Sequence, residues 1–158
     1  MKNADWLKEV SILKGVPGDG LKTISGLLEP RKYGSGEAVY GENENGGSLY
    51  IVKSGKLRVY RTPKAENMSV VELATLKKND IFGEMSFLEE HLHTANISAV
   101  EDSEIYVLER EKFEGLVETD PRLAYLITRN LLLVIESIIR KMNADYVSMM
   151  EYMYIFGK

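Results

Sequence analysis

The stretch from Ile81 to Val100, IFGEMSFLEEHLHTANISAV, decides the fold and raises the question of function. It places Gly83 directly before a predicted short helix, where unpaired backbone N–H groups are able to converge on an anion. A phosphate also suits a guanidinium, whose planar fork meets two oxygens at once. The stretch contains no Arg or Lys, and offers His91 and His93 instead. It therefore predicts an anion site whose usual cation is missing.

The residues on either side of this stretch have the pattern of short strands and turns. From Arg31 to about Glu109, Gly, Asn and Asp separate short apolar runs such as SLYIVKSG (48–55) and EIYVLER (104–110). Apolar residues alternate with polar neighbours, as in strands that bury one face, at Leu49, Ile51, Leu57, Val59, Val71 and Leu73. We therefore predict a small antiparallel barrel, roll or sandwich.

Helices are predicted before this region. A first short helix is indicated by the helical spacing of Trp6, Leu7, Val10 and Leu13. A second, which ends before Pro30, is indicated by Leu21, Ile24, Leu27 and Leu28.

A long helix is predicted after the strands. Asp120 and Pro121 suit its N-cap and first position, and no Gly or Pro follows until about Phe156. At ~1.5 Å per residue this helix is on the order of 50 Å long, too long to lie wholly on so small a domain. We expect its first turns to pack on the domain and the part beyond about Ile138 to form a parallel homodimer. The predicted seam consists of Leu131, Ile135, Ile138, Met142, Met149 and Met153.

Length and composition exclude several classes. The chain has 158 residues, enough for one domain, and a formal net charge of -4, without the basic stripe of a nucleic-acid-binding protein. It has no Cys, which fits a cytoplasmic protein. No signal peptide or membrane-spanning run is evident, so we expect a soluble protein that does not bind the membrane.

Together these features resemble the cyclic-nucleotide-binding domain family, in the arrangement of the CRP-type regulators. Three segments carry the resemblance: SLYIVKSGKLRVYR (48–61), IFGEMSFL (81–88) and HTANISAV (93–100). The resemblance implies a mainly β fold with flanking α, a jelly-roll-like β-roll (double-stranded β-helix). Residues 1–119 would form this β-roll with its N-terminal helices, and residues 120–158 a long C-terminal dimerisation helix of the same domain.

The resemblance also implies a ligand site. Glu84 matches the family's Glu that accepts a hydrogen bond from the ribose 2′-hydroxyl. Backbone N–H groups near Gly83, Met85 and Ser86 match those that meet the cyclic phosphate. The family's Arg aligns with His93, and the hydroxyl residue after it with Thr94. The implied ligand is cAMP or cGMP, and no cofactor or metal is expected.

Two departures from the family bear on binding. At neutral pH an unperturbed imidazole is mostly neutral and makes no two-pronged contact, so His93 in place of Arg should weaken binding by roughly two to four orders of magnitude. The long helix is apolar in NLLLVIESII (130–139), where the family has polar contacts to the base. Asn130 and Ser137 are the remaining polar candidates there. No helix-turn-helix follows, so direct DNA binding is not expected.

An enzyme is the less favoured alternative. His91-Leu92-His93 is an HxH sequence of the kind that metal-binding cupins use, but there is no third His, and Ile97 and Ser98 are not ligands. No nucleophile-base-acid set is evident. We therefore expect a stand-alone, non-enzymatic regulatory or sensory module, which binds a cyclic nucleotide weakly or an altered small anionic ligand and moves its long helix about a hinge at 113–120. The alternative is a ligandless scaffold that dimerises or binds another protein through YVSMMEYMYIF (146–156), its pocket filled by side chains such as Phe87.

Overall fold

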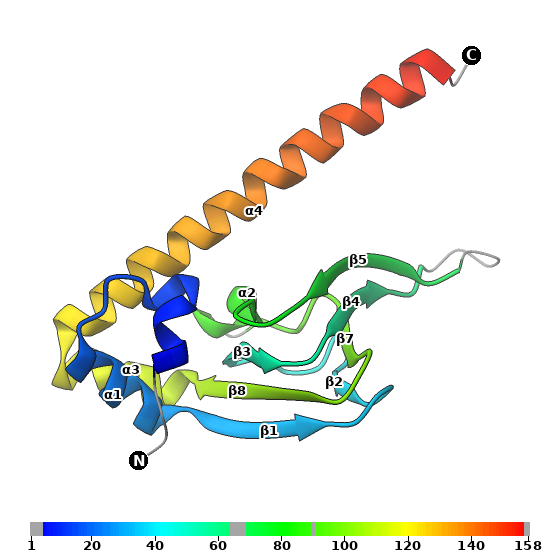
Figure 1. The fold of residues 1–158 in the computed structure, drawn as a ribbon. Coiled ribbons are helices and arrows are strands. Elements are labelled where there is room, and N and C mark those ends of the chain that lie inside the picture. Colours follow the sequence, from blue (N-terminus) through cyan, green and yellow to red (C-terminus); the bar gives the residue numbers. More distant parts are fainter. Residues whose placement is uncertain (1–4, 64–68, 90, 157–158) are drawn as a thin grey trace.

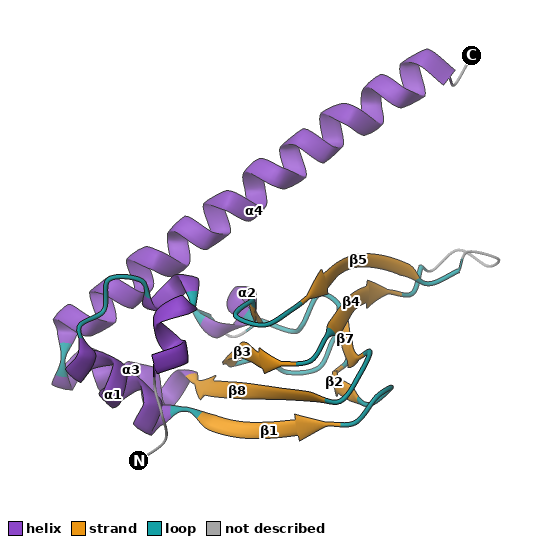
Figure 2. Ribbon diagram, viewed as in Figure 1, coloured by secondary structure: helices purple, strands orange, loops and turns teal. Residues whose placement is uncertain are grey.

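Two four-stranded antiparallel sheets form the body of the protein in the computed structural model, which describes residues 5–63, 69–89 and 91–156 (Figure 2). The first sheet has the order β1 (Glu29–Tyr33), β8 (Ser103–Glu109), β3 (Ser48–Ser54) and β6 (Ile81–Phe82). The second has the order β2 (Ala38–Tyr40), β7 (Asn96–Ala99), β4 (Leu57–Arg61) and β5 (Val71–Leu76). The predicted β-roll is thus confirmed.

The central strand β3 is buried on both faces. Tyr50 and Val52 point into the roll, while Leu49 and Ile51 join the core beneath the helices. In the second sheet β5 is an edge strand, and Leu73 is 55% exposed. The alternation in the sequence predicted that each of these strands buries one face, and this is wrong for both. Helices cover the outer side of β3, so both of its faces are buried. Nothing in the described chain covers β5 around Leu73, so its apolar side chain there stays exposed.

The helices gather at one end of the roll (Figure 1). Before β1 lie two 3₁₀ helices, η1 (Asp5–Glu9) and η2 (Ser11–Leu13), and the helix α1 (Gly18–Leu27). After β8 comes α3 (Arg110–Thr119), which the sequence pattern did not predict. The first predicted helix therefore exists as two 3₁₀ turns, whose Leu7, Ile12 and Leu13 are nonetheless buried as expected.

The final helix α4 (Pro121–Phe156) runs from this helical end out past the roll (Figure 1). Its start is the predicted one, because the Leu123 N–H donates to Asp120 Oδ1 at 3.0 Å. Buried residues of α4 end at Leu131, which is 1% exposed. Ile135 is only partly buried against the chain's own core, so the predicted seam is wrong at its first position, Leu131. No helix within the described ranges is long and apolar enough to cross a membrane.

Candidate functional site

A cavity of about 500 Å³ lies between the roll and the second half of α4. Strands β4, β5 and β6, the short helix α2 (Glu84–Phe87) and the chain from Leu92 to Ile97 contribute its roll side. All six residues that the sequence singled out line it: Gly83, Glu84, Met85, Ser86, His93 and Thr94. The volume falls within the range of small-molecule sites. The fold therefore gathers the candidate residues at one hollow.

Gly83 makes the turn that starts α2. Its φ of 81° is in the left-handed region, which side chains rarely adopt. A Cβ there would lie 2.7 Å from the Ser48 carbonyl oxygen and 2.8 Å from the Tyr50 ring. Only glycine fits this close approach to β3, and the turn carries Glu84 to the cavity wall.

The loop between β2 and β3 fixes the segment that holds the two histidines. Asn43 N–H donates to the His93 carbonyl at 2.8 Å, and His93 N–H donates to the Glu44 carbonyl at 2.9 Å. Gly46 N–H donates to the His91 carbonyl at 3.2 Å. A Cβ on Gly46 would lie 2.1 Å from Ser86 Cβ, so the loop closes on α2 only because this residue is glycine. These contacts make the roll side of the cavity a pre-formed wall.

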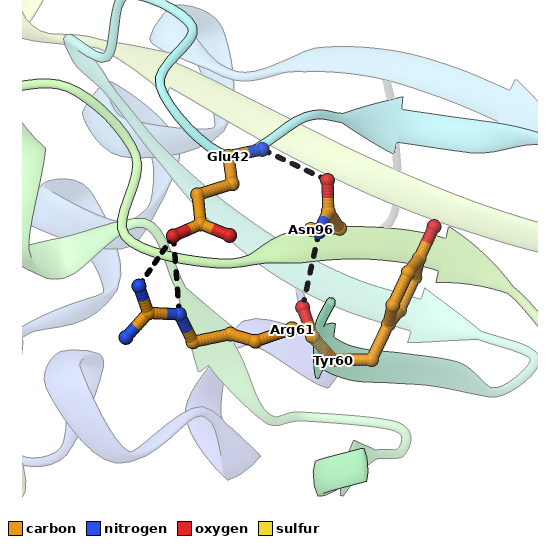
Figure 3. Close-up of polar contacts among 4 residues, drawn as sticks. All are labelled: Glu42, Tyr60, Arg61 and Asn96. Atoms are coloured by element: carbon orange, nitrogen blue, oxygen red, sulfur yellow. Dashed lines mark hydrogen bonds and ion pairs between the residues drawn. The ribbon is translucent and has the colours of Figure 1, made fainter. Parts of the chain in front are cut away.

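Asn96 joins three segments behind that wall (Figure 3). Its side-chain oxygen accepts from the Glu42 N–H at 2.9 Å, and its Nδ2 donates to the Tyr60 carbonyl at 3.3 Å. Arg61 pairs with the Glu42 carboxylate through Nε and Nη2. The β2–β3 loop, β4 and β7 are therefore tied together beside the cavity, a role that the sequence pattern did not indicate.

His93 is part of the wall, not a solvent-facing cation. It is 5% exposed, and its ring stacks on Tyr40 with centroids 3.5 Å apart and planes at 6°. Its Nδ1 lies 3.4 Å from Ser86 Oγ. Burial lowers the pKa of His93 below 6.5, against a smaller opposing effect of Glu44. The imidazole is thus neutral at neutral pH, and this position supplies no positive charge.

Glu84 is a partly buried carboxylate at the start of α2. Burial raises its pKa, while a backbone hydrogen bond acts in the other direction. Burial also raises the pKa of Tyr40, with a further contribution from the Glu84 charge. Beside them, Met85 and Thr94 are exposed and line the cavity. The roll wall therefore offers one carboxyl, hydroxyls and apolar surface.

The two polar candidates on the long helix lie elsewhere. Asn130 is buried, and its Nδ2 donates to the carbonyls of Ile12 at 3.0 Å and Lys14 at 2.8 Å. Ser137 lines a separate hollow beside η2. Neither lines the candidate cavity of this chain, and Asn130 instead anchors the N-terminal segment to α4.

The residues of α4 that do line the cavity were missed. They are Ile138, Lys141, Met142 and Asp145. Their spacing, i, i+3, i+4 and i+7, places them on one face of the helix. That spacing was visible in the sequence, but which helical face meets the roll depends on how the first turns of α4 dock. Phe87 does not line the cavity; it is buried against Phe113 of α3 with ring centroids 5.3 Å apart.

The HxH pair is split between two environments. His91 is exposed with its Nε2 3.1 Å from Glu89 Oε2, whereas the His93 ring lies against Tyr40. Among the residues that the structure describes, no three His, Cys, Asp or Glu side chains are placed to hold a metal ion. The two histidines therefore do not form a shared metal site.

Comparisons with known proteins agree with this geometry. Residues 30–120 match the model of the cyclic nucleotide-binding domain. The chain is 33% identical over 116 residues to cGMP-dependent protein kinase 2 of Homo sapiens, which covers 73% of this chain and 15% of the kinase. It is 32% identical over 129 residues to the cyclic AMP receptor protein of Thermus thermophilus, covering 79% of this chain and 59% of the receptor.

A solved structure shows the same fold. The crystal structure of Thermus thermophilus catabolite activator protein superposes with a TM-score of 0.76 at 27% identity, covering 90% of this chain and 63% of that one. The chain thus spans about 15% of the kinase and about 59% of the receptor that it matches. On the family match and the shared β-roll, the chain belongs to the cyclic nucleotide-binding domain family.

Proposed function

We propose that this protein is a non-enzymatic, cytoplasmic regulatory module that binds a cyclic nucleotide, or another small anionic ligand, in the cavity between the roll and α4. One observation carries this proposal: all six candidate residues line a single hollow of about 500 Å³ whose opposite wall is α4. The family's relatives named above support it, since one is a cGMP-dependent kinase and another a cyclic AMP receptor protein. In the proposed site Glu84 accepts from the ribose, and Gly83, Met85, Ser86 and Thr94 meet the cyclic phosphate.

Binding should be weak if the roll wall acts alone. His93 is stacked and neutral, so the phosphate meets no guanidinium there. Losing a charge-assisted, two-pronged contact weakens binding by roughly two to four orders of magnitude.

A packed path leads from the cavity to α4. Phe87 of α2 contacts Phe113 of α3. Helix α3 ends at Thr119, and the non-helical backbone of Asp120 separates it from α4. We propose that a ligand which shifts α2 moves α3 through this aromatic contact and changes the angle of α4 at Asp120. The ligand must contact the two states differently for this to occur.

The proposed partner of α4 is a second copy of this chain. Beyond Leu131 the apolar side chains follow an uninterrupted heptad: Leu132, Ile135, Ile139, Met142, Tyr146, Met149, Met153 and Phe156. Positions a and d of a two-stranded coiled coil show this spacing. The revised seam replaces the irregular one predicted from Leu131, and seven of its eight side chains, all but Ile135, are exposed in the single chain.

Two substitutions test the dimer. Ile139→Asp places a charge at a seam position, and Ser148→Asp places the same charge at an exposed position of the same helix that is not part of the heptad seam. In sedimentation equilibrium, wild type and Ser148→Asp are expected to dimerise and Ile139→Asp to be monomeric. Equal association of all three would contradict the seam.

Calorimetric titration with cyclic AMP and cyclic GMP tests the ligand site. Thr94→Glu adds a negative charge to the cavity wall, and the control Thr62→Glu adds it at an exposed loop position that does not line the cavity. We expect saturable binding to wild type and Thr62→Glu and none to Thr94→Glu. If wild type binds neither nucleotide, cyclic-nucleotide binding is ruled out and the ligandless scaffold is favoured.

A further inference from the structure

Few charges face the cavity, and only one of them is positive. Glu84 and Asp145 are the acidic side chains among its lining residues, and Lys141 is the single Lys or Arg among the lining residues that the structure describes. His93 is buried in the roll wall and stacked on Tyr40. An anion in this cavity therefore finds a fixed positive charge on α4 and none on the roll.

Lys141 is available for a ligand. Its neighbour Arg140 pairs with Glu136, whereas Lys141 forms no ion pair with any residue that the structure describes. It is exposed and shares a helical face with Ile138 and Asp145. Met142 on this face belongs to the proposed dimer seam, whereas Lys141 falls at heptad position c, which a coiled-coil partner does not cover. Its flexible four-carbon stem allows the ammonium group to follow a ligand.

We propose that Lys141 supplies the positive charge that holds the phosphate of a bound cyclic nucleotide, in place of the cation that the roll lacks. This inference rests on the proposed function and names a specificity-determining residue for it. Because Lys141 belongs to α4, the ligand's charge ties this helix to the roll directly. Occupancy of the cavity then stabilises the arrangement in which both walls contact the ligand.

The test compares charged ligands with their uncharged parents. Calorimetric titrations with cyclic AMP, cyclic GMP, adenosine and guanosine are made on wild type and three variants. Lys141→Gln removes the charge, Lys141→Arg keeps it, and Arg140→Gln removes a charge one residue away that does not line the cavity. Both positions are exposed, so unchanged thermal melting is expected to show that each of the three variants is folded.

We expect wild type to prefer a cyclic nucleotide over its nucleoside, and Lys141→Gln to lose about tenfold of that preference. Arg140→Gln and Lys141→Arg should retain it. The inference is overturned if Lys141→Gln binds cyclic nucleotides as wild type does, if it loses nucleotide and nucleoside equally, or if Lys141→Arg fails as Lys141→Gln does. If wild type binds a cyclic nucleotide in any of these cases, the proposed function still holds. If wild type binds neither cyclic nucleotide, both this inference and the proposal of cyclic-nucleotide binding are overturned.

Discussion

The two walls of the cavity are built in opposite ways. The roll wall is held by backbone hydrogen bonds between the β2–β3 loop and the chain at 91–93, by the Tyr40–His93 stack and by two close glycine contacts. The α4 wall is one helix, with no buried residue after Leu131. A pre-formed wall positions a ligand, whereas a wall with little packing of its own is free to respond to it. In the proposed function the roll therefore binds the ligand and α4 responds to it.

The largest effect is expected from breaking the roll wall at its tightest point. In Gly46→Ala the new Cβ would overlap Ser86, so the loop must separate from α2. We expect a loss of about 3 kcal/mol in the free energy of unfolding, measured by urea denaturation. The matched control is Gly115→Ala in α3, where a Cβ meets nothing within 4 Å, and stability should rise by about 0.5–1 kcal/mol. Equal stability of the two variants would show that the loop is not closed on α2.

A smaller loss of stability should follow from releasing the N-terminal segment from α4. Asn130→Ala leaves the carbonyls of Ile12 and Lys14 without their shared donor. We expect unfolding to become easier by about 2 kcal/mol, with faster amide exchange in η1 and η2. Ser137→Ala, on an exposed position of the same helix, serves as the control and should change neither. An unchanged exchange rate in Asn130→Ala would contradict the anchoring role.

The smallest effect concerns pH. His93 has a lowered pKa in the folded protein, so the unfolded chain takes up a proton first as pH falls through about 6.5. The stabilisation of the fold that comes from neutral His93 is therefore fully present above about pH 6.5. It is lost as the pH falls toward the pKa of His93 in the folded protein. His93→Gln should lower the slope of stability against pH between about 7.5 and 5.5, while the exposed His91→Gln should not. Identical slopes in the two variants would mean that His93 is not buried.

The sequence predicted the parts of the fold that local chemistry decides. Asp120 before Pro121 marked the start of α4, and Gly83 marked the turn into α2, because capping and a positive φ depend on the residue itself. The family resemblance placed all six candidate residues in the 81–100 stretch, and all six line the same cavity.

What the sequence did not predict depends on tertiary placement. Predicting that Lys141 lines the cavity requires knowing which face of α4 meets the roll. That face is set by how α4 docks, which depends on the Asn130 hydrogen bonds to the carbonyls of Ile12 in η2 and of Lys14. The same placement buries Leu131 in the core and leaves Leu132 at the start of the exposed seam. For His93 the residue type suggested a weak cation, but only the Tyr40 stack shows that it belongs to the wall.

Whether one ligand bridges both walls is tested most directly by amide hydrogen–deuterium exchange with and without cyclic GMP or cyclic AMP. We expect a saturating nucleotide to slow exchange both at 81–89 in the roll wall and at 138–145 in α4, and Thr94→Glu to remove both effects. Protection confined to the roll wall would contradict the bridging role of α4, and unchanged exchange in both segments would contradict the ligand site itself.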